Sequence, residues 1–354
     1  MENPETQATA KTVDVVIPVY NAPELTKRCI DSIVTHLGKS IQRVLIQDDA
    51  SGCETREMLD HLPYPCVEVC HAEKNQGFGL TVNAAVGRSN AFYVLILNSD
   101  TEVNQNILPQ LCAAFDADDK LAAIIPAGNS YNRFDFSRYA LHEGNYIQTY
   151  YLRGHAILIR RDAFLTVGGF DATFGRGYYE DIDLGRRLDL NGWRFGVHPD
   201  VHIYHKGAGS FGEDRIQLAR RNRAVYLSRY PEAQQNILLL SGNCALADFN
   251  EDFLQAIEQR FHAGGSVHWF SPAQPSHLSC LQMHGYAARL RMILKVLSRG
   301  WQRADRRVTE IWIAPGAPFF LRALLTVWAH WQNLKILVFE EAMTQDPATK
   351  LRVK

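Results

Sequence analysis

The stretch that decides the fold is Val13-Asp14-Val15-Val16-Ile17-Pro18-Val19-Tyr20-Asn21, which follows a short polar segment. Its β-branched residues predict a strand over 13–19. Further strand patterns lie at residues 43–47, 67–71 and 92–97. Helical periodicity separates these strands, at residues 22–36, 53–62 and 80–88. This alternation is typical of an α/β sheet with parallel strands, covered on both faces, that binds ligands at the carboxyl ends of its strands.

The alternation fails near residue 122 and begins again beyond residue 231. The back of the chain predicts four parallel strands, at 237–240, 267–270, 311–314 and 336–339, with helices near 251–262, 287–303 and 318–331. We expect a second, smaller α/β domain with a parallel sheet, about half of a typical doubly wound domain and therefore incomplete, as in a piece of a longer protein. The predicted divisions are a flexible N-terminus (1–12), a first domain (13–230), the second domain (231–344) and a mobile tail (345–354).

Composition excludes several classes of protein. With 46% hydrophobic and 21% charged residues, the 354-residue chain is not disordered, collagen-like or a coiled coil. Its net charge of -1 provides no field that attracts nucleic acid. The charge is divided, however: residues 1–209 hold 19 Lys+Arg and 26 Asp+Glu, and residues 210–354 hold 18 and 12. Seven cysteines without a C-x-x-C pair, no secretory leader and no spanning segment predict a cytoplasmic location.

Six polar clusters follow predicted elements in a fixed order. They are Pro18-Val19-Tyr20-Asn21, Asp48-Asp49, Asn75-Gln76-Gly77-Phe78-Gly79, Asn98-Ser99-Asp100, Glu180-Asp181 and His205. Over about residues 13–212 this succession resembles the inverting GT-A glycosyltransferases of family 2, and among them the rhamnosyltransferase-like bacterial members that decorate surface polysaccharides such as O-antigen and capsule. The resemblance implies a Rossmann-like GT-A mixed sheet and an enzyme that uses a nucleotide-diphosphate sugar.

A divalent cation is expected, because the diphosphate leaving group gains negative charge when its bond to the sugar breaks. The resemblance aligns Asn98-Ser99-Asp100 with the D-x-D motif of the family. It makes Asp100 and His205 ligands of Mn²⁺ or Mg²⁺. Asn98 departs from the motif because its amide brings no charge. His198 and His202 compete with His205 for this role, and an Asx turn without metal is the alternative for the whole cluster.

Inversion at the sugar carbon needs a base that deprotonates the acceptor hydroxyl. The resemblance makes Asp181 this general base, with Glu180 as a second catalytic candidate. Acidic residues are also common at the start of a helix for dipole reasons, so stabilisation of the predicted helix 180–188 is the alternative.

The remaining candidates concern the donor. Pro18, Val19, Tyr20 and Asn21 can bracket a pyrimidine, and Asp48 or Asp49 can accept a hydrogen bond from it. Both sites are also compatible with ordinary turns. The resemblance implies further donor contacts by Asn75, Gly77, Phe78, Asn83, Asn98, Ser99, Arg153 and Gly154.

The second domain carries no comparable motif, so its fold alone assigns it no reaction. Its basic amphipathic helix, from Arg289 onward, is expected to cover the sheet with a solvated basic face. The alternative is contact with an anionic membrane surface or with a lipid-diphosphate acceptor, which would make the protein peripheral on the inner face of the cytoplasmic membrane.

The sequence therefore predicts inverting, metal-dependent transfer from a nucleotide-diphosphate sugar, dTDP-rhamnose before UDP-sugars, to a glycan or lipid-linked oligosaccharide. Further domains or partner glycosyltransferases fit the incomplete second domain. Two alternatives stay open. A nucleotidylyltransferase would need a Gly- and Lys-rich phosphate loop, which residues 18–24 lack. A catalytically weak carbohydrate- or nucleotide-sugar-binding module of a larger polysaccharide-assembly protein is favoured by Asn98.

Overall fold

The computed structural model describes residues 11–132, 134–207, 215–303 and 306–339. The chain forms two compact units. The first comprises residues 1–132, 143–146 and 152–222, and the second comprises residues 133–142, 147–151 and 223–354. The main division thus falls at residue 222, inside a helix, and two short segments from the irregular middle of the chain belong to the second unit.

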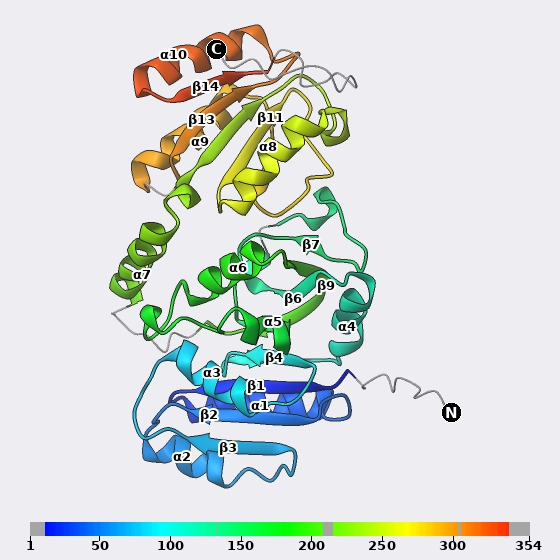
Figure 1. Cartoon of the computed structure of the whole chain (residues 1–354), viewed down its shortest axis with the longest axis vertical. Coiled ribbons are helices and arrows are strands. Elements are labelled where there is room, and N and C mark those ends of the chain that lie inside the picture. The colour runs from blue at the N-terminus through cyan, green and yellow to red at the C-terminus, as the bar shows by residue number, and fades with distance from the viewer. Residues whose placement is uncertain (1–10, 133, 208–214, 304–305, 340–354) are drawn as a thin grey trace, which may run out of the picture. The chain divides into compact units, whose positions relative to one another are not determined.

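The first unit is built on a mixed sheet (Figure 1). Its strands are β1 (Val13–Val19), β2 (Arg43–Asp48), β3 (Val67–His71), β4 (Tyr93–Leu97), β5 (Thr101–Glu102), β6 (Leu121–Gly128), β8 (Ala156–Arg160) and β9 (Arg194–His205). They lie in the order β3-β2-β1-β4-β8-β6-β9-β5. Strands β1 to β4 pair in parallel, whereas β8 is antiparallel to β4 and β6, and β5 is antiparallel to β9.

Helices cover both faces of this sheet. They are α1 (Pro23–Leu37), α2 (Cys53–Asp60), α3 (Phe78–Arg88), α4 (Leu108–Ala117), α5 (Arg161–Thr166) and α6 (Glu180–Leu190), with 3-10 turns at Asn129–Tyr131 and Ala172–Phe174. Helix α7 (Arg215–Arg229) contains the division between the units, and a further 3-10 turn, Phe136–Arg138, belongs to the second unit. Helix α1 buries Cys29, Ile30, Ile33 and Leu37, whose spacing of three or four places them on one side of the helix. They join the apolar side chains of β1 and α4 in one core, while α3 packs against β1 and β2.

Two features of this sheet differ from the sequence-based expectation. Strand β6 occupies residues 121–128, where the sequence predicts that the alternation of strands and helices ends, and its LAAIIPAG sequence has little of the β-branched character that marks a strand. The sequence pattern around residues 193–204 predicts two short strands, at 193–197 and 201–204, but the structure has one strand there, β9, whose pairing with β6 shifts register between Pro126 and Ala127. Burial along β6, rather than β-propensity, accounts for its extended conformation.

The second unit contains an all-parallel sheet. Its strands are β10 (Asn236–Leu240), β11 (Ser266–Ser271), β12 (Met283–Ala287), β13 (Val308–Ile313) and β14 (Lys335–Val338), in the order β12-β11-β10-β13-β14. The sequence predicted four of these five strands. It did not indicate β12, because its MHGYA sequence lacks a continuous apolar run.

Helices lie on both faces of this second sheet. They are α8 (Glu251–His262), α9 (Leu290–Gln302) and α10 (Phe319–Gln332), and 3-10 turns lie at Pro231–Gln234 and Leu246–Asp248. Alternate residues of β10 belong to two different cores: Ile237 and Leu239 pack with α8, whereas Leu238 and Leu240 pack with α9 and α10. No helix in the described ranges has both the length and the apolar character needed to cross a bilayer.

The two middle segments are held in the second unit by main-chain hydrogen bonds. Ala140 N donates to Leu278 O over 2.9 Å, and Leu278 N donates to Arg138 O over 2.9 Å. The Arg138 guanidinium donates to the carbonyl oxygens of Pro275 and Gly285. Residues 147–151, which include the short strand β7 (Ile147–Gln148), are tied in by Gln282, whose side-chain oxygen accepts from Tyr150 N. These contacts explain why a stretch without clear periodicity is ordered.

Candidate active site

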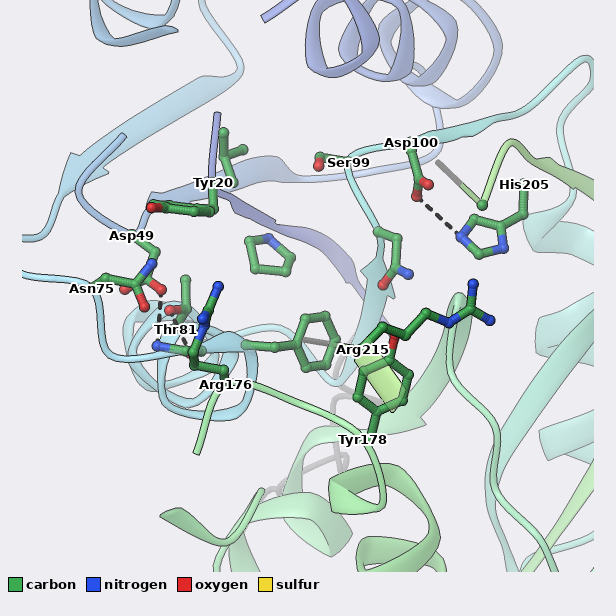
Figure 2. Close-up of a pocket in the computed structure, with 16 residues that line it drawn as sticks. Tyr20, Asp49, Asn75, Thr81, Ser99, Asp100, Arg176, Tyr178, His205 and Arg215 are labelled. Carbon is green, nitrogen blue, oxygen red and sulfur yellow. Dashed lines mark hydrogen bonds and ion pairs between the residues drawn. The ribbon is translucent and has the colours of Figure 1, made fainter. Parts of the chain in front are cut away.

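The first unit contains a cavity of about 290 Å³, a volume at the small end of ligand-binding sites (Figure 2). It lies beside the carboxyl ends of β1 and β4. Its walls consist of Pro18, Val19, Tyr20, Asp49, Asn75, Gly77, Phe78, Thr81, Asn98, Ser99, Asp100, Arg176, Tyr178, His205, Gly207 and Arg215. The structure therefore brings together eleven of the residues selected from the sequence: Pro18, Val19, Tyr20, Asp49, Asn75, Gly77, Phe78, Asn98, Ser99, Asp100 and His205.

One end of the cavity is shaped by Asp49. Its carboxylate accepts hydrogen bonds from Gln76 N (2.7 Å) and Gly77 N (2.9 Å), so it fixes the loop between β3 and α3. Gly77 has φ of +87°, and a Cβ atom there would lie 2.5 Å from Gly175 O. Only glycine fits this close approach of two loops. Figure 2 shows Tyr20, Asp49 and Asn75 on this side of the cavity.

Three other donor candidates have their polar atoms engaged within the protein. Asp48 is fully buried, and its carboxylate accepts from Ser51 N (3.1 Å) and contacts His71 Nδ1 (2.7 Å). Asn21 bridges the ends of β1 and β2, accepting from Gly52 N and donating through its main chain to the Ser51 hydroxyl. Asn83 binds the main-chain N–H and carbonyl of Phe170. These three residues do not line the cavity, but their hydrogen bonds position the loops that form it.

The opposite end of the cavity holds Asp100 and His205. Asp100 Oδ1 lies 3.1 Å from His205 Nε2, although the residues are more than one hundred positions apart. The antiparallel pairing of Thr101 with His205 in β5 and β9 produces this contact. Burial opposes ionisation of Asp100, but hydrogen bonds from His205 and from main-chain N–H groups, including that of Gly207, outweigh it and lower the pKa of Asp100. Asp100 is therefore an ionised oxygen donor at neutral pH.

Two further groups suit this end of the cavity to a cation. The Asn98 side-chain oxygen is buried and has no hydrogen-bond partner in the part of the chain that the structure describes. The His155 ring stacks on His205 with ring centroids 5.0 Å apart and an interplanar angle of 14°. Burial, then the neighbouring His205, lowers the pKa of His155 to about 4, so its ring is neutral. Carboxylate, amide oxygen and imidazole are donors that Mn²⁺ and Mg²⁺ accept.

The number of strong metal ligands is small, however. Within the described residues, no group of three or more His, Cys, Asp or Glu side chains converges as a metal cluster would. Neither His198 nor His202 is among the cavity residues, whereas His205 is. The pair Asp100 and His205, with the Asn98 oxygen, fits a cation that keeps water or ligand oxygens in its remaining positions.

Asp181 and Glu180 form the first turn of α6, outside the residues that line the cavity. Asp181 Oδ2 accepts from Gly154 N (3.0 Å), and its Oδ1 accepts from Ile182 N (2.8 Å). Glu180 is buried, and its Oε2 has no hydrogen-bond partner among the described residues. Burial raises the pKa of both carboxyl groups, and the charge of Asp181 raises that of Glu180 further. The exposed Arg153 acts in the opposite direction on Asp181.

The structure adds five residues to the cavity wall that were not selected as donor contacts from the sequence: Thr81, Arg176, Tyr178, Gly207 and Arg215. Arg215 places positive charge on the side of Asp100 and His205, and Arg176 places it at the opposite end of the cavity, beside Asn75 and Thr81 (Figure 2). Arg215 begins α7, a helix with arginine also at 220, 221, 223 and 229. These arginines follow the glycine-rich sequence 206–212, and the combination is the sequence signal that could have indicated an anion-binding side of the cavity.

Asn222, which the sequence analysis did not select, binds the segment 174–178 that leads into α6. Asn222 is fully buried, and its Nδ2 lies 2.6, 2.6 and 3.0 Å from the carbonyl oxygens of Phe174, Gly177 and Tyr178. The adjoining Tyr178 and Tyr179 both have positive φ, at 70° and 73°. A local sequence pattern does not reveal such an anchor, because the residues it joins are far apart in the chain.

Comparison with known proteins gives this geometry a context. Residues 14–176 match the family described as glycosyl transferase family 2. An N-acetylglucosaminyl-diphospho-decaprenol L-rhamnosyltransferase of Mycobacterium tuberculosis is 40% identical over 78 residues, which are 22% of this chain and 25% of the relative. A pre-mycofactocin glycosyltransferase of the same organism is 28% identical over 210 residues, covering 55% of this chain and 43% of the relative. The matches thus span less than half of either relative.

Solved structures include a mannosyltransferase of Pyrobaculum calidifontis in complex with GDP-Man and Mn²⁺, which is 20% identical, covers 60% of this chain and 61% of that one, and has a TM-score of 0.48. The family match includes the parallel strands β1 to β4 of the first sheet and most of the residues that line the cavity. Residues 14–176 therefore form a family 2 glycosyltransferase domain, which is built on the mixed sheet of the first unit.

Proposed function

We propose that the first unit transfers a sugar, with inversion, from a nucleotide-diphosphate donor to a glycan or lipid-linked glycan acceptor. The observation that carries this proposal is the convergence of Asp100, His205, Arg176 and Arg215 on one cavity within a family 2 domain. A diphosphate needs positive charge to leave, and these residues supply it directly or by holding a cation.

The two ends of the cavity suit the two ends of such a donor. Tyr20 and Asp49 would bind the nucleoside at one end of the cavity, where Figure 2 also shows Arg176, and Arg215, on the side of Asp100 and His205, would face the diphosphate. Asp100 and His205 would hold Mn²⁺ or Mg²⁺, which would neutralise the leaving group. Asp48, Asn21 and Asn83 would act through the loops that they position, because their polar atoms bind the protein itself. The name of the matched rhamnosyltransferase favours rhamnose as the transferred sugar, and the family resemblance then puts dTDP-rhamnose before UDP-sugars as the donor.

Asp181 is the residue that we propose as the general base. Its carboxylate is fixed by the N–H groups of Gly154 and Ile182, and its raised pKa suits a group that must take up a proton during the reaction. Asp181 lies three residues after the cavity residue Tyr178, so the base would stand next to the cavity wall. Glu180 would stay protonated beside it, since burial disfavours its charge.

Ligand-induced thermal shift tests the donor site. The protein is heated with dTDP, UDP or GDP, each with Mn²⁺ or Mg²⁺, and with each nucleotide or metal alone. A ligand that binds only the folded state raises the melting temperature. We expect dTDP or UDP to do so, with a larger rise when the cation is present. An unchanged melting temperature with every combination would contradict the proposal.

Asp181→Asn tests the base. We expect this variant to bind the nucleotide normally and to lose about 10²-fold or more in sugar transfer or donor hydrolysis, the usual scale of general-base catalysis. Asp162→Asn is the matched control, because Asp162 also lies in the first turn of a helix and its Oδ1 accepts from the next N–H, that of Ala163, over 2.7 Å. Equal activity of the two variants would remove Asp181 from the mechanism. Normal binding without turnover in the unmodified protein would instead indicate a nucleotide-sugar-binding module.

A further inference from the structure

The outer faces of α9 and α10 in the second unit expose large apolar side chains. Trp301 of α9 and Phe319, Phe320, Val327 and Trp331 of α10 are each between 66% and 85% exposed. These five residues are called the α9–α10 surface below. Scattered apolar residues are normal on a protein surface, but a group of four aromatic residues and a valine on neighbouring helices marks a site that contacts a partner or a membrane.

Contacts between tryptophan rings join the two helices within this surface. The ring of Trp301 lies 5.9 Å from that of Trp328, which in turn lies 5.3 Å from that of Trp331. Leu290 and Leu294, which are also exposed, extend the surface along α9. Their spacing of four from each other, and of seven from Leu294 to Trp301, places these side chains on the same side of the helix.

The exposed aromatic residues do not serve the core of the unit. Helix α9 already buries Ile293, Val296 and Leu297 against the sheet, and α10 buries Leu321, Leu325 and Ala329. Helix α10 thus has an inward apolar stripe and a second apolar stripe that faces outward. A helix that only covered a sheet would carry polar residues on its outer face. On α9 the exposed Leu290, Leu294 and Trp301 border the inward stripe, and the side turned away from the sheet carries Arg291 and Lys295.

The charges around this surface have one sign. Arg291 and Lys295 are exposed on the same turns of α9 as the leucines, and Arg322 is exposed on α10. Neither helix contains Asp or Glu, and residues 311–339 contain none at all. Exposed tryptophan and phenylalanine with positive charges around them complement a partner that offers apolar groups next to negative charges. The surface of an anionic bilayer offers both, because acyl chains lie directly below the lipid phosphates, and tryptophan favours the boundary between them.

We propose that the second unit docks on an anionic lipid bilayer through the α9–α10 surface. Phe320 and Trp331 would enter the boundary between headgroups and acyl chains, while Arg291 and Lys295 would bind lipid phosphates. This inference rests on the second unit alone and does not depend on the sugar-transfer activity proposed for the first.

Co-sedimentation of the full chain with vesicles tests the proposal. One set of vesicles contains equal parts of phosphatidylglycerol and phosphatidylcholine, and the other contains phosphatidylcholine only. We expect binding to the anionic vesicles that weakens with salt and falls roughly fivefold for each cation removed, hence about 25-fold for Arg291→Gln with Lys295→Gln. Brominated lipids should quench tryptophan emission of the bound protein, and less so in Trp331→Ser.

Phe320→Ser with Trp331→Ser is expected to abolish vesicle binding without lowering the melting temperature, because both side chains are exposed. Leu141→Ser, at an exposed leucine in the second unit outside α9 and α10, is the control and should bind as the unmodified chain does. Three results would overturn the proposal: no binding to anionic vesicles, equal binding to neutral ones, or an equal loss in the control. A fourth result comes from light scattering of the protein without lipid. If the chain forms a stable oligomer and Phe320→Ser with Trp331→Ser dissociates it, the surface is a protein interface and not a membrane site.

Discussion

Replacing Asn222 by leucine tests whether one buried amide sets the shape of the segment that leads into α6. In the native structure Asn222 Nδ2 faces three main-chain carbonyl oxygens at 2.6, 2.6 and 3.0 Å, and its Oδ1 accepts from Arg221. Leucine has a similar volume but donates no hydrogen bond. The variant therefore removes the polar contacts and leaves buried carbonyl groups without this donor.

The expected cost follows from these contacts. An amide has two N–H groups, each contributing roughly 1 kcal/mol net, and a buried acceptor left without a donor adds a further penalty, so the free energy of unfolding should fall by about 2–4 kcal/mol. In a unit of this size that corresponds to a fall in melting temperature of roughly 4–16 °C. The two tyrosines with positive φ, Tyr178 and Tyr179, each store about 1–2 kcal/mol of backbone strain, so the segment should relax once the anchor is gone.

Thermal unfolding and nucleotide-induced thermal shift measure the two effects. We expect Asn222→Leu to melt earlier and to lose the shift caused by nucleotide with Mn²⁺, because Tyr178 lines the cavity. The matched control is Asn191→Leu, at an exposed asparagine whose Nδ2 donates to a single carbonyl, that of Arg187, over 2.9 Å. A melting temperature of Asn222→Leu close to that of the control, with an unchanged nucleotide response, would refute the assigned role.

Three further substitutions test other parts of the first unit. Gly77→Ala should strongly lower both stability and nucleotide binding, because the alanine Cβ would collide with backbone atoms and residue 77 has φ of +87°. The control, Gly87→Ala, places its Cβ in open space on α3 and should be neutral or stabilising by about 1 kcal/mol, and melting curves of the two variants test this difference. Glu180→Gln should raise the melting temperature at pH 8 more than at pH 4, because a carboxyl whose pKa is raised in the folded state loses stability as the pH rises above its unfolded value; an equal change at both pH values would contradict the burial argument. Asp100→Ala should abolish Mn²⁺ binding measured by electron paramagnetic resonance, while the exposed Asp119→Ala should retain it; retention by both would remove Asp100 from the cation site.

Much of the first unit could be predicted from the sequence because its signals are local. Strands such as Val13–Val19 and helices such as Pro23–Leu37 show their own periodicity, and polar residues just after parallel strands must meet at one sheet edge. The family resemblance stated from the ordered clusters is confirmed by the family match over residues 14–176. The individual site residues and their roles stay predictions.

Other features depend on partners far away in the chain. Strand β6 has little β-propensity and exists because it is buried between neighbours, and β12 forms although no apolar run marks it. The segments 133–142 and 147–151 showed no periodicity, and their hydrogen bonds to residues such as Leu278 and Gln282 define their conformation. No window of a few residues contains that information.

By itself, the sequence determined the alternation of strands and helices, the family of the first unit and the sheet edge at which its polar clusters gather. Only the tertiary structure decided which of those residues share a cavity. Antiparallel pairing of β5 with β9 joined Asp100 to His205, and α7 brought Arg215 to the same wall. The physical reason is that periodicity reports which face of an element is buried, whereas the contacts of a site depend on strand order and register, which non-local packing sets.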